Sequence, residues 1–329
     1  MELVNFELIK KIRYHITRTE KQAELLTNRK KWLQVTSALD VLEDTSWAIE
    51  YYVEQDYPDD MKGKYLYTYG VLQALYVQQD AINSINQALF DEVINFKEKY
   101  PEIYNVREMR DDVAGHPTSR RNKQFIHLAQ CSMSKEGFYY IKNDSEKEDF
   151  EVITVSVTDA IGDVANNINS ILQKAVDDLD SEFQEYIDKH KDRKMKEIFS
   201  QLGDAKAKVL NKEHMSDWGY ESTKNMVKRC EEELVLRYGS VDAFDTYKFL
   251  LDEIHEIYDL LENDISGISS ESRDNIEKYL LQILFVKLED LESYCEETDE
   301  YFENRGEESV STGEDVDISF IFGEENLSE

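Results

Sequence analysis

The side chains best suited to chemistry lie in one basic stretch, residues 107–123, with the sequence REMRDDVAGHPTSRRNK. It holds five cationic and three acidic side chains, whereas the whole chain carries a net charge of −32. Arg110 is followed by Asp111 and, after four further residues, by His116. A fixed cation can stabilise charge on a phosphate group, and an imidazole can transfer protons near neutral pH. The stretch therefore suits phosphoryl chemistry.

Local sequence signals predict a short helix over residues 105–114 that ends just before His116. Gly115 can end a helix in the left-handed conformation, and Pro117 cannot continue one. His116 is then expected to project from the end of the helix. The competing interpretation, which spacing alone favours, is a helix cap in which His116 interacts with the last backbone carbonyls.

This arrangement resembles the Arg-x4-6-His motif of HEPN domains, which lies near the end of a helix in an all-helical core. The resemblance covers roughly residues 1–130, and the run 65–90 fits a core helix of such a domain. It implies a metal-independent endoribonuclease, of the kind found in toxin–antitoxin and phage-defence systems, that works as a homodimer. Carried over by position, Arg110, Asp111 and His116 are the catalytic arginine, its polar neighbour and the catalytic histidine.

In such a ribonuclease, His116 acts as general base or acid, and Arg110 holds the scissile phosphate. Asp111 orients one of them. The other basic side chains of the stretch are expected to bind RNA: Arg107, Arg120, Arg121 and Lys123. Because the 2′-hydroxyl supplies the nucleophile, neither a metal nor another cofactor is expected, and DNA should resist cleavage. The alternative, from a different class, is a non-catalytic HEPN-like helical module that binds a protein partner or a nucleotide.

Composition limits the fold class and the cellular setting. The chain has 329 residues, 41% of them hydrophobic, with only 12 glycines and 3 prolines, so long helices fit better than a barrel or sandwich. The cysteines are scattered and predict neither a disulfide framework nor a zinc site: Cys131, Cys230 and Cys295. No signal-like or membrane-spanning apolar run is present, so a cytoplasmic protein is expected.

Charge is spread unevenly along the chain. Residues 1–35 contain eight Lys or Arg and four Glu, whereas residues 289–329 contain sixteen acids and a single Arg. The large negative total argues against a protein that coats nucleic acid. Residues 305–329 are expected to form a disordered acidic tail. The apolar residues 318–322 within it are either a docking motif or a segment that folds back on the core.

Hydrophobic periodicity predicts a mainly α fold in four parts: a HEPN-like bundle (1–122), a three-stranded antiparallel β meander (123–157), a long helix with a C-terminal helical region (158–304) and the tail (305–329). Helices are expected over 2–27, 32–56, 64–99, 157–202, 216–237, 241–264 and 272–304. One apolar stripe of the third helix is interpreted as packed core rather than a base-stacking platform: Leu66, Tyr69, Leu72, Leu75 and Tyr76.

Overall fold

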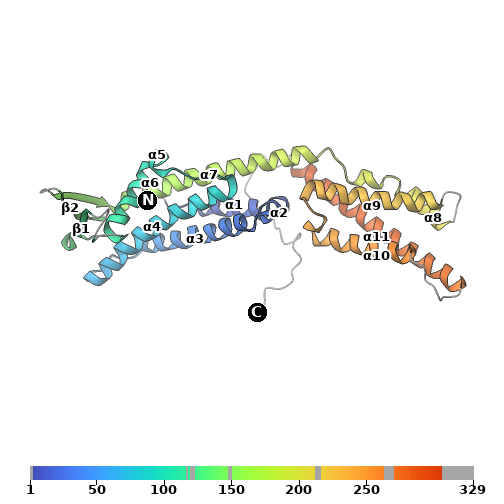
Figure 1. Cartoon of the computed structure of the whole chain (residues 1–329), viewed down its shortest axis with the longest axis horizontal. Helices are drawn as coiled ribbons and strands as arrows, with labels where there is room; N and C mark the ends of the chain where they lie inside the picture. Colours follow the sequence, from blue (N-terminus) through green and yellow to red (C-terminus); the bar gives the residue numbers. More distant parts are fainter. Residues whose placement is uncertain are drawn as a thin grey trace. The chain divides into compact units, whose positions relative to one another are not determined.

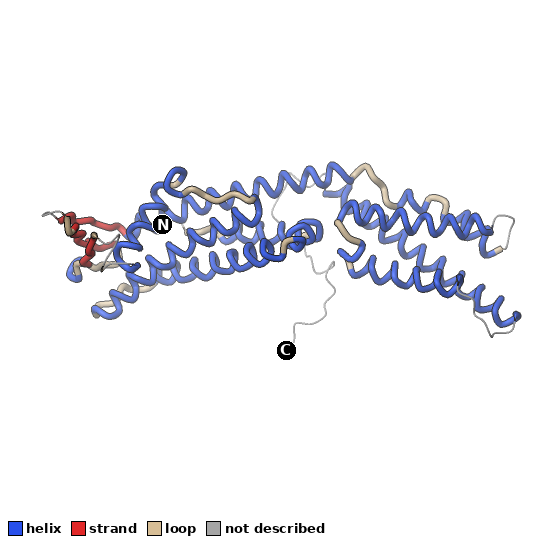
Figure 2. Tube along the Cα trace, in the orientation of Figure 1, coloured by secondary structure: helices blue, strands red, loops and turns tan. Residues whose placement is uncertain are grey.

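The computed structural model of the chain describes residues 3–115, 118, 123–146, 150–211, 216–262 and 270–305. Over these residues it contains eleven α-helices and one antiparallel sheet of three strands (Figures 1 and 2). The predicted mainly α fold with a small β meander is therefore confirmed. The chain divides into two compact units, Met1–Ser181 and Glu182–Glu329. The likeness of the first bundle to HEPN domains and the four-part division remain predictions.

The first unit is a helical bundle with the sheet at one end (Figure 2). Its helices are α1 (Phe6–Thr17), α2 (Thr19–Thr27), α3 (Arg29–Glu54), α4 (Met61–Phe90), α5 (Phe96–Lys99), α6 (Pro101–Arg110) and most of α7 (Val157–His190). Local signals begin several of them. The side chain of Asn5 accepts a hydrogen bond from the backbone of Glu7, and Asp60 does the same for Lys62 and Gly63.

Several predicted helices are shorter in the structure. The helix expected over 2–27 is interrupted at Arg18, whose backbone is extended (φ −62°, ψ 142°). The helix expected to reach residue 99 ends at Phe90, because Asp91 adopts the left-handed conformation (φ 57°). The helix expected to reach residue 202 ends at His190. Beyond it, the Asp299 carboxylate accepts hydrogen bonds from the amides of Met195 and Lys196 and holds the chain in a different path.

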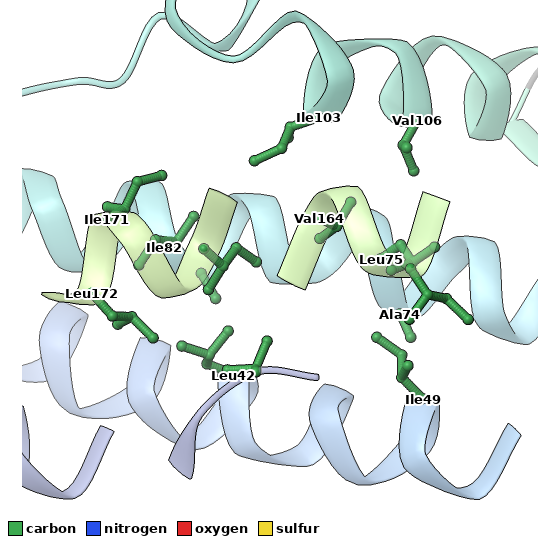
Figure 3. Close-up of a cluster of buried hydrophobic side chains, with 14 of the residues drawn as sticks. Leu42, Ile49, Ala74, Leu75, Ile82, Ile103, Val106, Val164, Ile171 and Leu172 are labelled. Atoms are coloured by element: carbon green, nitrogen blue, oxygen red, sulfur yellow. The ribbon is translucent and has the colours of Figure 1, made fainter. Parts of the chain in front are cut away.

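The core of the first unit is aliphatic and lies between α3, α4, α6 and α7. Figure 3 shows part of it: Leu42, Ile49, Ala74, Leu75, Ile82, Ile103, Val106, Val164, Ile171 and Leu172. Ile103 and Val106, the two buried residues of α6, are 0% and 3% exposed, and α6 packs on α4. Burying such side chains contributes roughly 1.5–3 kcal/mol each, so hydrophobic packing holds α6 in place. The predicted motif lies at the C-terminal end of this anchored helix.

The meander consists of β1 (Gln124–Leu128), β2 (Gly137–Asp144) and β3 (Phe150–Ser156), in that order and antiparallel. One face packs on the bundle through Ile126, Phe138, Tyr140 and Val155. The hairpin loop is also tied to the end of α3. Tyr52 donates a hydrogen bond to the carbonyl of Lys135, and the Lys135 ammonium donates to the carbonyls of Val53 and Gln55. These last carbonyls of α3 would otherwise lack intrahelical partners.

The second unit contains the end of α7 together with α8 (Leu202–Leu210), α9 (Ser216–Tyr238), α10 (Asp245–Glu262) and α11 (Ser270–Arg305). Its core includes three fully buried aromatic side chains: Phe199, Phe285 and Phe302. The thiols of Cys230 and Cys295 lie 3.7 Å apart in this core and are not joined. None of the helices in the described part of the chain has a stretch both long enough and apolar enough to cross a membrane.

Candidate functional site

The predicted motif lies where α6 passes into a single π-helical turn, η1 (Asp111–Gly115). Such turns occur frequently at functional sites. The expected left-handed cap at Gly115 is wrong, because Gly239 (φ 77°) is the one glycine with positive φ in the described part of the chain. Gly115 instead lies close to the ends of two motif side chains. A Cβ atom there would lie 2.9 Å from Nη1 of Arg110 and 3.3 Å from Oδ1 of Asp111.

Arg110 is held by partners on two elements. Its Nε and Nη2 atoms donate to Oε1 of Gln73 on α4, at 3.0 and 2.7 Å, and its Nη1 atom donates to Oδ1 of Asp111 at 3.0 Å. The guanidinium carbon lies 4.4 Å from the centre of the Tyr76 ring. The side chain is nevertheless 21% exposed. The arrangement is a fixed cation at the surface, in contact with solvent.

Arg107 shares the same aromatic ring. Its guanidinium carbon lies 4.0 Å from the centre of Tyr76, and Nη2 donates to the Tyr76 hydroxyl at 2.8 Å. Nη1 forms an ion pair with Asp80 at 2.8 Å. The Tyr76 ring thus contacts both guanidinium groups, and cation–π attraction is added to the hydrogen bonds. The structure brings Arg107, Arg110 and Asp111 together.

The two adjacent aspartates have different surroundings. The Asp111 side chain is 31% exposed and bonds to Arg110. The Asp112 side chain is 5% exposed, and its Oδ2 atom accepts hydrogen bonds from the Tyr140 hydroxyl and the Lys142 ammonium, at 3.0 and 3.1 Å. Asp112 therefore joins the π-helical turn to β2, and this connection stabilises the backbone that carries Asp111.

Of the other predicted site residues, the structure describes only Lys123, which is not part of this arrangement. Lys123 lies directly before β1, where it forms an ion pair with Glu146 at 2.6 Å. His116, Arg120 and Arg121 lie outside the described residues. Their assignment as the catalytic histidine and two RNA-binding cations remains a prediction.

Sequence reasoning missed the residues of α4 that hold the arginines. Gln73, Tyr76 and Asp80 lie at spacings of three and four, which places them on one helical face. The signal that was available is the recurrence of polar or amphipathic residues at that spacing. The predicted packed stripe is divided in the structure. Its buried members are Leu72 and Leu75, Tyr76 is half-buried, and Leu66 and Tyr69 are exposed.

A shallow hollow of about 680 Å³ lies between the start of α3 and the end of α4, and is lined by residues that include Arg29, Lys30 and Gln87. Arg110 is not among its lining residues. In the described ranges no group of three or more His, Cys, Asp or Glu side chains is arranged to hold a metal ion.

Comparisons with known proteins identify no relative. No protein-family model, no curated protein and no solved structure matches the chain. The resemblance to HEPN domains consequently rests on the motif and its helical setting, and function has to be argued from the site itself.

Proposed function

We propose that the chain is a metal-independent endoribonuclease of the HEPN type, with Arg110, Asp111 and His116 as its catalytic residues. The proposal rests on one observation. Arg110 is a preorganised cation that remains open to solvent, fixed by Gln73, Asp111 and the Tyr76 ring. A group that is already oriented needs no reorganisation when charge develops on a phosphate.

The hydrogen bonds of Arg110 leave donors for a ligand. Among the described residues it uses three of the five N–H donors of a guanidinium, which leaves one on each of Nη1 and Nη2. Two parallel N–H groups match two phosphate oxygens. His116 is the residue that follows Gly115, and a Cβ atom added to Gly115 would lie 2.9 Å from Nη1 of Arg110. The proposed acid–base group thus follows a residue that lies close to the cation.

In the proposed reaction, the 2′-hydroxyl of RNA attacks the adjacent phosphorus. A P–O2′ bond forms and the P–O5′ bond breaks, with a 2′,3′-cyclic phosphate and a 5′-hydroxyl as products. His116 takes the proton of the 2′-hydroxyl as base or supplies a proton to the leaving 5′-oxygen as acid. Arg110 stabilises charge on the equatorial phosphate oxygens, and Asp111 orients Arg110 through the bond at 3.0 Å. Because the nucleophile belongs to the substrate, DNA is not cleaved.

The test is cleavage of a mixed-sequence RNA in excess EDTA, compared with DNA and 2′-O-methyl RNA of the same sequence. Arg110→Ala and His116→Ala should each lower the rate about a hundredfold or more. The matched controls are Arg13→Ala and His255→Ala, since both side chains form surface ion pairs, with Glu43 and Glu231 respectively. They should retain activity. Intact RNA after long incubation with the wild-type protein, as monomer or dimer, would exclude the enzyme.

A second candidate function is the non-catalytic interaction module, and the second unit supplies the observation that favours it. Large apolar side chains on α10 and α11 remain exposed: Phe249, Leu260, Tyr279, Ile283 and Val286. Exposed apolar groups gathered on one helical hairpin are typical of protein-binding surfaces. Sedimentation tests the homodimer that the HEPN resemblance implies. If the protein proves inactive on RNA, this surface becomes the place to seek its function.

A further inference from the structure

We propose that Tyr69 is a base-stacking residue, which binds a nucleobase of the RNA whose phosphate Arg110 contacts. This inference rests on the proposed function and extends it to a substrate-binding residue. It also reverses the expectation that the whole Tyr and Leu stripe of α4 is packed core. The side chain of Tyr69 is 38% exposed, whereas Leu72 and Leu75 on the neighbouring face are fully buried.

Tyr69 belongs to the face of α4 that carries the arginine site. Tyr69, Gln73, Tyr76 and Asp80 follow one another at steps of four, three and four, so their side chains share one side of the helix. Gln73 binds Arg110 directly. Tyr69 lies one turn before Gln73, about 6 Å along the helix axis. One nucleotide can span that distance between its phosphate and its base.

The direction in which α6 runs along α4 also points to Tyr69. Arg107 contacts Asp80 and Tyr76, and Arg110 contacts Tyr76 and Gln73. As residue numbers rise along α6, those of the α4 partners fall, so the two helices are antiparallel at the site. The π-helical turn Asp111–Gly115 continues from α6 and also packs on α4. The part of α4 that follows Gln73 in this direction is the turn that carries Tyr69.

The surroundings of Tyr69 leave its ring accessible. Tyr65 packs edge-on against it, with ring centroids 5.7 Å apart and an interplanar angle of 71°. This contact orients the Tyr69 ring without stacking on it. Leu66 is 72% exposed, and a Cβ atom added to Gly70 would meet no atom of the described residues within 4 Å. The chain therefore presents an oriented aromatic ring beside open surface and one turn from a fixed cation.

Aromatic stacking suits a protein with this charge. With a net charge of −32, extended contact with RNA phosphates is unfavourable, so affinity has to come from a few local contacts. A tyrosine ring stacks on any base and tolerates sequence variation. The expected substrate is consequently single-stranded RNA with an unpaired base next to the scissile phosphate, since a base inside a duplex is not available for stacking.

The experiment measures binding separately from cleavage. A fluorescently labelled single-stranded 2′-O-methyl RNA cannot be cleaved by the proposed route, and its affinity is read by fluorescence anisotropy at low salt. Tyr69→Ala should weaken binding about tenfold, on the scale of one lost stacking contact, whereas Tyr69→Phe and Tyr69→Trp should keep it. Tyr294→Ala is the matched control, because Tyr294 lies in the other unit and is exposed to the same degree, 37% against 38% for Tyr69. In Tyr69→Trp, RNA should quench the new tryptophan emission.

The outcomes separate the inference from the proposed function. Wild-type cleavage of RNA together with unchanged binding by Tyr69→Ala would overturn the stacking role and leave the enzyme intact. Loss of binding in Tyr69→Ala, with no cleavage by the wild-type protein, would support the RNA-stacking site and overturn the catalytic proposal. Equal loss in Tyr69→Ala and Tyr69→Phe would show that the hydroxyl, and not stacking, makes the contact. Absence of any RNA binding by the wild-type protein overturns both.

Discussion

Each of the two units contains an arginine stacked on an aromatic ring and bonded to acidic side chains. In the first unit Arg110 lies over Tyr76 and bonds to Asp111. In the second unit Arg237 lies over Phe302, with its guanidinium carbon 4.6 Å from the ring centre, and its Nε atom donates to Glu233 at 3.0 Å. Residue types alone do not distinguish these clusters.

Burial separates them. The Arg237 side chain is 0% exposed, and its Nη1 atom is buried without a hydrogen-bond partner among the residues that the structure describes. Arg193 adds a second cation on Glu233, at 2.5 Å. Burial alone raises the pKa of the Glu233 carboxyl, but hydrogen bonds from Arg193 and Arg237 outweigh it and leave that pKa below its ordinary value. The Arg110 side chain is 21% exposed to solvent, whereas the spare donor of Arg237 is enclosed. A fixed arginine is a candidate for binding only where a ligand can reach it.

The largest expected effect concerns Arg237. Arg237→Met leaves the buried Glu233 and Asp299 without their shared cation and should lower the free energy of unfolding by about 3–5 kcal/mol. Arg110→Met should cost less than about 1 kcal/mol, since its ion pair is partly exposed. Urea unfolding measures both: Trp218 reports the second unit in a Trp32→Phe, Trp47→Phe background, and Trp32 and Trp47 report the first unit in a Trp218→Phe background. Equal losses would remove the distinction between the two clusters.

Asp111 and Asp112 offer the same comparison, between an exposed and a buried charged side chain, within one helical turn. Asp112→Ala leaves Tyr140 and Lys142 without their buried acceptor and should lower the free energy of unfolding by about 2–3 kcal/mol. Asp111→Ala should change stability little and should lower the rate of RNA cleavage, because Arg110 loses an orienting contact. Thermal unfolding and the EDTA cleavage assay are measured on both variants. Loss of activity without loss of stability in Asp112→Ala would contradict the assignment.

Acidification should weaken the second unit through His190. Burial and the nearby Arg237 guanidinium lower the pKa of His190 to about 4, from an ordinary value of 6.5. The unfolded chain takes up a proton as pH falls through 6.5, while the folded chain does not until about pH 4. The stabilisation is therefore complete above pH 6.5 and declines below it, by up to about 1.4 kcal/mol per pH unit.

Urea unfolding of the second unit between pH 7 and pH 4 checks this expectation. His190→Gln should show a shallower decline than the wild-type chain, because one titrating group has been removed. His255→Gln, at an exposed histidine paired with Glu231, is the control and should follow the wild-type curve. Parallel curves for all three proteins would rule out His190 as the source.

The smallest effect concerns two glycines of the first unit. Gly70 lies inside α4 with open space around it, so Gly70→Ala should raise the free energy of unfolding by up to about 1 kcal/mol. Gly115→Ala should instead displace Arg110, because the added Cβ would lie 2.9 Å from Nη1. We expect slower RNA cleavage from Gly115→Ala, in the assay described above. Full activity in that variant would show that the position of Arg110 is not critical.

Much of the fold was predictable because it depends on local periodicity. The 3.6-residue spacing of apolar side chains predicted the long helices, and the aromatic and β-branched runs after residue 123 predicted the meander that is observed. Helix ends were predicted less well. The interruption at Arg18 has no glycine or proline to announce it, and the segment after α7 is bonded to Asp299, which lies over a hundred residues further along the chain.

For the candidate site, the sequence by itself determined which groups are present: a cation, an adjacent carboxylate and a histidine, close together because they are close in the chain. Only the tertiary structure decided what surrounds them. It brought Gln73 and Tyr76 of α4 against Arg110, and it directed Asp112 into the core while Asp111 remained at the surface. Asp111 and Asp112 are residues of the same type at neighbouring positions, so the sequence does not distinguish them. Packing between distant segments determines which of them is buried and which can meet a ligand.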